Sequence, residues 1–217
     1  YQTIKPYITG NTLEIGSGIG NLSAFFLKDN ISITLSDTEQ EYIDILKKKF
    51  EGNKNLKSII SINLEHPSLE KTHPDLKEKF DTVFLLNVLE HINDDHLAIN
   101  NTYFLLKPGG ILVILTPAYP FLFSKLDLAL EHRRRYTTNK LKLLLSESGL
   151  ISIKSFYFNL LGILAWVYGK IFGLKTIPAG EMRFFNRIVP IARLIDKITF
   201  RKAGLSAIIV GKKDQKS

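Results

Sequence analysis

The chain contains the segment Leu13-Glu14-Ile15-Gly16-Ser17-Gly18-Ile19-Gly20-Asn21, in which a strand pattern runs directly into a glycine-rich turn and a helix. Glycines are needed in such a turn because a side chain would block the close approach of a ligand to the backbone. Glycine-rich turns also occur without a ligand, so the neighbouring residues matter. Glu14 stands just before the glycines, where a charge needs a cationic or hydroxyl partner. The segment therefore favours a ligand-binding turn.

An acidic residue, Asp37, follows the next strand pattern. An acid at the end of this strand can bind the two hydroxyls of a ribose. An ordinary turn at a strand end is the alternative interpretation. The third glycine of the turn, Gly20, comes one position earlier than in the G-x-G-x-x-G pattern of dinucleotide-binding dehydrogenases. We therefore expect that nicotinamide cofactors do not bind.

Up to about residue 150, short β-branched runs alternate with helical patterns, which predicts a parallel sheet. The strands expected in this part of the chain are Thr12–Ile15, Ser32–Leu35, Ser58–Ile62, Thr82–Leu86 and Ile111–Leu115. After Gly149 the alternation changes. Further strands are expected at Ile151–Phe158 and Ser206–Val210, with an insertion between them.

Three helices can be placed between these strands. In Glu41–Phe50 the apolar residues expected on one face are Tyr42, Ile45, Leu46 and Phe50. Asn93 is expected to cap a second helix, which Pro108-Gly109-Gly110 ends. Thr137 or Thr138 is expected to cap a third helix, Asn139–Ser148.

The pattern E-x-G-x-G-x-G at Glu14–Gly20 resembles the first motif of class I S-adenosylmethionine (SAM)-dependent methyltransferases, and Asp37 resembles that family's ribose-binding acid. Two later segments are similar to the family's fourth-strand motif and to the turn into its fifth strand: Phe80-Asp81-Thr82-Val83-Phe84-Leu85-Leu86-Asn87-Val88-Leu89-Glu90-His91-Ile92 and Lys107-Pro108-Gly109-Gly110-Ile111-Leu112. The resemblance covers residues 12–117. It implies an α/β fold, a Rossmann-like seven-stranded mixed sheet in a three-layer α/β/α sandwich with the last strand antiparallel. Residues 1–217 would form one methyltransferase domain, with a SAM-binding core at 12–150 and a helical insertion at 156–202.

The resemblance also implies a role for individual residues toward SAM. The methionine part would lie against Gly16, Ser17 and Gly18, followed by Gly20, with Glu14 facing its ammonium group directly or through water. Asp37, beside Thr38, would hold the ribose. Asn63 and Leu64 would border the adenine, with Asn63 where the family more often has Asp. Asn87, beside Val88, would lie near the sulfonium, or else satisfy a strand end.

The acceptor side is expected in the segment Asp127–Tyr136, which follows the fifth strand. Here His132 can accept a proton near neutral pH, and arginines can clamp an anionic group. The segment resembles a D…H-x-R-R-Y type of sequence in a bacterial, cell-envelope-associated methyltransferase subfamily. We therefore expect His132 as the catalytic base and Arg134, Arg135 and Tyr136 as acceptor-binding residues, with Arg133 dispensable. A helix-capping loop with a solvated charge run is the alternative.

His91 is interpreted as architectural, because its Leu-Glu-His-Ile phrase is common in this fold whatever the substrate. Some quinone-type O-methyltransferases place a metal near a similar Glu-x-x-Glu-His sequence. In this chain Asn87 stands where the first acid of that sequence would be. We therefore expect no metal site.

The insertion is unusually apolar. Leu160–Tyr168 is apolar on all sides but too short to span a bilayer, and Phe184–Phe200 places Phe184, Ile188, Ile191, Ile195 and Ile198 on one helical face. Three interpretations stay open: a lid over the acceptor pocket, a surface that lies on an anionic membrane, and a layer that covers the core.

The net charge of +8 and the pI near 9.5 suggest an anionic partner, or a solvated basic surface with no specific role. The sequence has no cysteine, which excludes disulfides and thiolate sites, and it starts with Tyr1 without a secretory signal. A cytoplasmic protein is expected, either free or peripheral at the inner face of the membrane.

The expected function is SAM-dependent methylation, at oxygen, of a small or lipid-linked acceptor of the sugar or quinone type in cell-envelope biosynthesis. One alternative is an RNA or DNA methyltransferase, prompted by the charge. The Asn/Asp-Pro-Pro-Tyr/Phe motif does not follow the fourth strand, so nucleic acid is not expected as a partner. A SAM-binding scaffold without catalysis is the other alternative.

Overall fold

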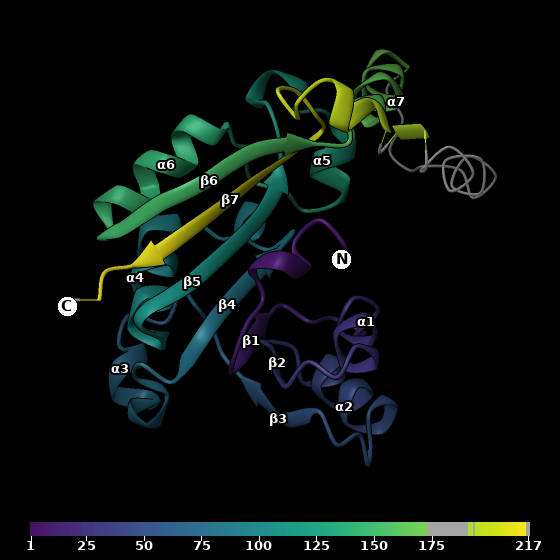
Figure 1. The fold of residues 1–217 in the computed structure, drawn as a ribbon. Coiled ribbons are helices and arrows are strands. Elements are labelled where there is room, and N and C mark those ends of the chain that lie inside the picture. Colours follow the sequence, from purple (N-terminus) through teal and green to yellow (C-terminus); the bar gives the residue numbers. More distant parts are fainter. Residues whose placement is uncertain (173–190, 193, 216–217) are drawn as a thin grey trace.

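The structure is a computed structural model that describes residues 1–172, 191–192 and 194–215. Seven strands form one sheet in the order β3-β2-β1-β4-β5-β7-β6. Pairings within β3-β2-β1-β4-β5 are parallel, and β7 runs antiparallel to both β5 and β6 (Figure 1). The predicted mixed seven-stranded sheet with an antiparallel last strand is therefore confirmed.

The strands are β1 Thr12–Ile15, β2 Ile33–Asp37, β3 Leu56–Ser61, β4 Phe80–Leu86, β5 Leu106–Pro117, β6 Leu150–Phe158 and β7 Ser206–Lys213. The α-helices given by the structure are α1 Ser23–Lys28, α2 Gln40–Lys49, α3 Leu69–Thr72, α4 Asp95–Leu105, α5 Lys125–Ala129, α6 Thr138–Glu147 and α7 Leu160–Ile171. Short 3₁₀ turns are η1 Lys5–Tyr7, η2 Pro74–Leu76, η3 Leu89–His91 and η4 Pro120–Leu122.

Alternating residues of the central strands bury opposite faces of the sheet. In β4, Val83 and Leu85 pack against the helices α3, α4 and α6, whereas Phe84 points to the opposite face and packs with Phe26 of α1 and Leu46 of α2. Figure 1 shows these two helical groups on either side of the sheet. The three layers agree with the predicted sandwich.

Some predicted boundaries need correction around α4. Asp94, not Asn93, caps the helix, since its carboxylate accepts a hydrogen bond from the Leu97 N–H at 2.9 Å. The helix ends at Leu105, before Pro108-Gly109-Gly110, and these three residues already belong to β5. By contrast, Thr137 caps α6 as expected, accepting from the Lys140 N–H at 3.2 Å.

The insertion expected at 156–202 is partly helical in the described residues, after β6 ends at Phe158. The apolar run Leu160–Tyr168 lies within α7, which extends to Ile171. Of Phe184–Phe200, residues 191–192 and 194–198 are helical, whereas 184–190 and 193 lie outside the description. No helix within the described residues is both long enough and apolar enough to cross a bilayer.

Parallel strands bring their carboxyl ends to one edge of the sheet, and ligands of such sheets bind at that edge. The chain segments that follow β1, β2, β3 and β4 therefore meet there. These are the segments that carry the glycine turn, Asp37, Asn63 and Asn87.

Candidate active site

The glycine turn between β1 and α1 takes backbone conformations that favour glycine. Gly16 and Gly18 have φ angles of 70° and 52°. A Cβ atom at Gly16 would lie 2.5 Å from Val88 Cγ2, whereas a Cβ at Gly18 would have no protein atom within 4 Å. The backbone at Gly18 therefore borders open space in which a ligand can approach closely.

Asp37 lies at the end of β2 and is 8% exposed. Its Oδ2 atom accepts a hydrogen bond from the Gly18 N–H at 2.8 Å, and its Oδ1 atom accepts from the Glu39 N–H at 3.2 Å. A carboxylate has about four acceptor positions, so two remain for a ligand. The two backbone bonds hold the carboxylate in place beside the turn, in a suitable arrangement for a pair of vicinal hydroxyls.

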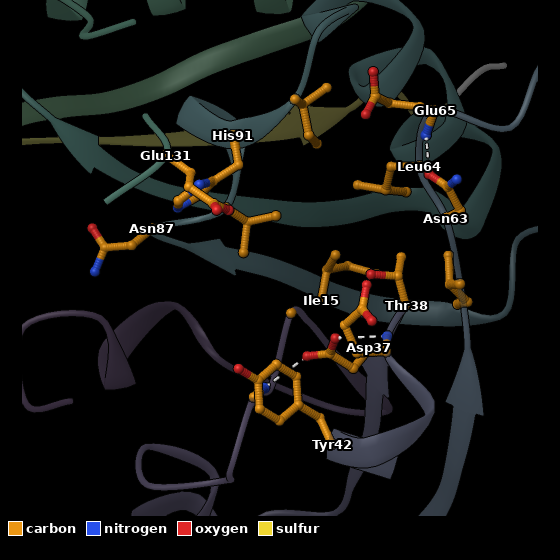
Figure 2. A pocket seen from close by; sticks show the side chains of 16 residues that line it. Ile15, Asp37, Thr38, Tyr42, Asn63, Leu64, Glu65, Asn87, His91 and Glu131 are labelled. Atoms are coloured by element: carbon orange, nitrogen blue, oxygen red, sulfur yellow. Dashed lines mark hydrogen bonds between the residues drawn. The ribbon is translucent and has the colours of Figure 1, made fainter. Parts of the chain in front are cut away.

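A cavity of about 480 Å³ opens between these residues and the ends of β3 and β4. Figure 2 shows Asp37, Thr38 and Tyr42 on one side, Asn63, Leu64 and Glu65 on another, and Asn87, His91 and Glu131 opposite. The volume lies in the range of sites for cofactors and small ligands. Its lining residues are Ile15, Gly16, Gly18, Asp37, Thr38, Glu39, Tyr42, Ile62, Asn63, Leu64, Glu65, Asn87, Val88, His91, Ile92 and Glu131.

The side of the cavity after β3 combines apolar and amide groups. Ile62 and Leu64 are buried, and Asn63 is exposed between them. The Asn63 Oδ1 atom accepts a hydrogen bond from the Glu65 N–H at 2.8 Å, which fixes the side chain in its own turn (Figure 2). One lone pair of Oδ1 and the amide N–H groups stay available to a planar, hydrogen-bonding ligand.

Sequence reasoning missed Tyr42 as a site residue. It was assigned to the buried face of its helix, but α2 buries Ile43 and Leu46, and Tyr42 is 38% exposed and lines the cavity. The signal that could have found it is its position five residues after Asp37, in the first turn of a helix that starts at the cavity.

Three of the residues predicted to contact the cofactor do not line the cavity: Glu14, Ser17 and Gly20. Glu14 is 4% exposed and accepts a hydrogen bond from the Ser23 hydroxyl. Burial raises the pKa of Glu14 to about 7, although hydrogen bonds from Ser23 and Ser17 oppose that shift. Ser17 holds the turn against β2, since its N–H donates to Ser36 O at 2.9 Å.

Asn87 follows β4 in the left-handed conformation, with φ of 55°. Asn adopts this conformation more readily than most residues. Its N–H donates to Leu115 O at 2.9 Å, and its exposed side chain lines the cavity beside Val88. The arrangement fits both interpretations of Asn87, as a strand-end residue and as a group beside the ligand.

His91, interpreted from its sequence context as architectural, lines the cavity in the structure. His91 ends the turn η3, and its ring meets the ring of His132 edge-on with 5.0 Å between centroids. Burial, followed by the neighbouring His132, lowers the pKa of His91 below its usual 6.5. The lowered pKa favours the neutral imidazole at the cavity wall, the form that can accept a proton.

His132 lies behind His91 and is not a lining residue. Its side chain is 9% exposed, and its Nδ1 atom is 3.0 Å from Asp127 Oδ1. Its Nε2 atom lies 4.0 Å from Glu90 Oε1. One potential ligand atom from each of Glu90, His91 and His132 lies within 4.8 Å of the others, a spacing that could hold a metal ion. The absence of a metal site stays a prediction.

In the structure the predicted acceptor-binding side chains contact protein partners, and their role toward an acceptor stays a prediction. Arg135 has a fully buried side chain, whose Nε atom pairs with Asp127 Oδ1 at 2.7 Å. Arg134 pairs with Asp95 at 3.2 Å, and the Tyr136 hydroxyl donates to the same carboxylate at 3.1 Å. None of the three lines the cavity.

Arg133, expected to be dispensable, also has internal partners. Its N–H donates to Glu90 O at 2.8 Å, and its Nε atom donates to His91 O at 2.7 Å. Together with the contacts of Arg134 and Tyr136, these bonds join residues 133–136 to the chain around η3. The segment expected to bind the acceptor therefore stabilises the turn η3, which positions His91 at the cavity wall.

Glu90 is fully buried, and neither carboxylate oxygen has a hydrogen-bond partner. Burial raises its pKa from 4.5 to about 8. In the folded chain the Glu90 carboxyl group thus stays protonated up to about pH 8, whereas in the unfolded chain it loses its proton near pH 4.5. Glu90 therefore makes the stability of the fold decrease as the pH rises across that interval.

We expect Glu90→Gln to be more stable than the wild type at about pH 8, and the advantage to disappear near pH 5. The advantage at the higher pH should exceed about 1 kcal/mol, since one pKa unit corresponds to about 1.4 kcal/mol. Urea unfolding at both pH values, with a chelator in every buffer, measures it. A stability difference independent of pH would show that Glu90 is ionised in the folded chain.

Comparisons with known proteins bear on this site. Residues 13–112 match the model of a methyltransferase domain family. The matched residues include the glycine turn, Asp37 and His91, and so contain most of the cavity lining.

Two curated relatives and one solved structure extend the comparison. Probable polyketide synthase 40 of Dictyostelium discoideum is 30% identical over 137 residues, which cover 54% of this chain and 5% of the relative. Ubiquinone biosynthesis O-methyltransferase of Coxiella burnetii is 30% identical over 106 residues, 49% of this chain and 43% of the relative. A SAM-dependent methyltransferase from Archaeoglobus fulgidus superposes with a TM-score of 0.65 at 17% identity, over 98% of this chain and 90% of that chain.

The chain thus spans less than half the length of these curated relatives. The methyltransferase domain match and the fold of the solved structure confirm the predicted Rossmann-like architecture.

Proposed function

We propose that the chain is a SAM-dependent methyltransferase that uses the cavity at the carboxyl ends of β1 to β4. The observation that carries the proposal is the pairing of Asp37, held by the Gly18 and Glu39 N–H groups, with the open space beside Gly18. A carboxylate with two free acceptor positions at a glycine turn suits the ribose of an adenosine cofactor.

The cavity fits the parts of SAM. Asp37 would hold the ribose hydroxyls, and Ile62, Asn63 and Leu64 would border the adenine. The glycine turn would lie along the methionine part, with Glu14 and Ser17 supporting it from behind rather than contacting it. When bound, SAM supplies an electrophilic methyl group on a sulfonium, and the chain's own contribution is to align an acceptor with that methyl group and to exclude water.

We assign the group that takes the acceptor proton to His91, in place of His132. His91 lines the cavity and has a lowered pKa, so its neutral form can accept a proton from an acceptor hydroxyl. His132, oriented by Asp127, packs its ring against His91 and so acts through it as a positioning residue. The arginines of residues 133–135 hold this arrangement together through their contacts with η3 and Asp127.

The acceptor is proposed to be a small or lipid-linked molecule of the sugar or quinone type that is methylated at oxygen. The Coxiella relative is named as a ubiquinone biosynthesis O-methyltransferase, which supports oxygen as the acceptor atom. The exposed apolar side chains beyond the cavity support a lipid-linked acceptor. We accordingly propose a cytoplasmic protein of cell-envelope biosynthesis, located at the inner face of the membrane.

Incubating the protein with methyl-labelled SAM and fractionated bacterial envelope lipids tests the activity. We expect label to enter an organic-soluble fraction, with stoichiometric formation of S-adenosylhomocysteine. Label in added RNA or DNA would favour a nucleic-acid methyltransferase instead. Binding of SAM without transfer to any fraction would favour a non-catalytic scaffold.

Asp37→Ala should weaken the binding of S-adenosylhomocysteine by about 1.5–3 kcal/mol, the range for hydrogen bonds to a charged group. Isothermal titration calorimetry measures the change. Asp44→Ala is the matched control, because Asp44 is an exposed acid on the neighbouring helix α2 and does not line the cavity. Equal affinities of Asp37→Ala and the wild type would remove the ribose assignment.

A further inference from the structure

The exposed large apolar side chains gather at one end of the molecule. Seventeen large apolar side chains are exposed in the described residues, and eleven of them come from three segments that follow β5 and β6. These eleven are Phe121, Leu128, Leu130, Leu164, Tyr168, Ile171, Phe172, Ile191, Leu194, Ile198 and Phe200. Scattered exposed apolar residues are ordinary, but such a concentration marks an interaction surface. These eleven side chains are called the apolar surface below.

Two helices supply most of the apolar surface, each with one exposed apolar face. On α7, Leu164, Tyr168 and Ile171 are 70%, 52% and 73% exposed, whereas Gly162 and Gly169 are buried on the other side. Their spacing places the three exposed side chains on one face of the helix. A helix that packs through glycines and turns its large apolar side chains outward is not simply covering a core.

The second helix has the same arrangement. Ile191, Leu194 and Ile198 are more than half exposed and share a face by their spacing. Asp196, on another side of this helix, is 2% exposed, and its carboxylate accepts hydrogen bonds from the Asn159 and Leu160 N–H groups at 2.8 and 2.9 Å. The helix is thereby anchored at the start of α7.

The remaining segments connect the apolar surface with the cavity. Trp166 and Lys170 of α7 donate hydrogen bonds to the carbonyl groups of η4, and α5 also contacts α7. Figure 1 shows α5 and α7 at the same end of the sheet. Leu130, 47% exposed, directly precedes Glu131, which lines the cavity. The apolar surface therefore starts at the cavity rim.

Basic residues accompany the apolar side chains. In the described parts of 121–135, 159–172 and 191–202, the exposed basic residues are Lys125, Arg133, Lys170, Lys197 and Lys202. Among the acids of the same described residues, Glu131 is exposed, and Asp127 and Asp196 are buried. The segments that supply the apolar surface thus carry five exposed cations and one exposed carboxylate, a balance that is complementary to an anionic layer.

We propose that the apolar surface docks onto an anionic lipid bilayer and so brings the cavity rim to the membrane that carries the acceptor. Large apolar side chains would enter the boundary between headgroups and acyl chains, while the lysines would contact lipid phosphates. A symmetric dimer through the same surface is disfavoured, because it would bring two sets of like charges together. The proposal rests on the proposed function, which supplies the membrane-borne acceptor.

Flotation of the full chain with vesicles tests the proposal. We expect binding to vesicles that contain phosphatidylglycerol, weakened by salt, and much weaker binding to vesicles of phosphatidylcholine alone. The double variant Leu164→Glu/Ile171→Glu should bind phosphatidylglycerol vesicles at least about tenfold more weakly. Leu143→Glu is the matched control, because Leu143 is half exposed on α6, away from the apolar surface, and should bind as the wild type does.

Titration with S-adenosylhomocysteine and size-exclusion chromatography accompany each variant. Unchanged cofactor affinity in the double variant shows that it is folded, so that its loss of vesicle binding supports the proposal. A wild-type chain that binds S-adenosylhomocysteine but not the vesicles overturns the membrane proposal alone. Vesicle binding without cofactor binding overturns the proposed function and leaves the docking surface standing. A dimer that the double variant converts to monomers, without vesicle binding, assigns the surface to a second copy and overturns the proposal.

Discussion

His91→Ala is expected to lower the turnover of methyl transfer by about 10²–10⁴-fold, the usual contribution of a general base. The reason is that His91 supplies the imidazole among the residues that line the cavity. Since the pKa of His91 lies below 6.5, the acid limb of the wild-type turnover profile should also lie below that pH. The measurement is initial rate against pH with an acceptor fraction found by the labelled-SAM assay.

His132→Ala is the informative companion to this variant. We expect a smaller loss of turnover, because His132 acts through the orientation of His91, and the affinity for S-adenosylhomocysteine should change little in either variant. If His132→Ala instead removes more activity than His91→Ala, the assignment of the base to His132, made from the sequence, is correct. If neither variant slows transfer, the acceptor needs no base from this pair.

Asp127→Ala is expected to destabilise the fold by about 3–5 kcal/mol, the cost of breaking a buried ion pair at one partner. The Asp127 side chain is fully buried and holds Arg135, His132 and the Ser124 N–H together. Burial alone would raise the pKa of Asp127, but the hydrogen bonds from His132 and Arg135 lower it, so the carboxylate is ionised near neutral pH. Its removal would leave the Arg135 guanidinium charged and unpaired beside Glu90.

Urea unfolding near pH 7 measures this loss. Asp75→Ala is the control, since Asp75 is a largely exposed acid paired with Lys79 at 3.7 Å, and removing it should cost less than about 1 kcal/mol. A loss below about 1 kcal/mol for Asp127→Ala would mean that Arg135 finds another partner. In that case the bracing role of residues 133–136 would have to be reconsidered.

The sheet and the cofactor side of the cavity were predictable because their signals are local. A glycine turn must follow its strand directly, and Asp37 and Asn63 stand where adjacent parallel strands end, so their meeting follows from the topology. β5 was expected to start at Ile111 because Pro108-Gly109-Gly110 reads as a helix stop, whereas the strand starts at Leu106. There the pairing of Phe80 with Leu106 outweighs the local turn signal.

The acceptor side was harder to predict because its geometry depends on contacts between distant segments. Arg134, Arg135 and Tyr136 are residue types that bind anionic ligands, but their partners are Asp95 and Asp127. Which of two histidines reaches the cavity is decided by the folding of residues 133–136 onto η3, and neither spacing nor charge encodes that. Such internal ion pairs are the commonest alternative to a ligand site for buried arginines.

The most direct test of the central claim is a crystal structure with S-adenosylhomocysteine. We predict the ribose hydroxyls at hydrogen-bond distance from the Asp37 carboxylate, the adenine beside Asn63 and Leu64, and the sulfur on the side of Asn87 and His91. S-adenosylhomocysteine bound at another place, or bound in this cavity with its ribose away from Asp37, would contradict the account.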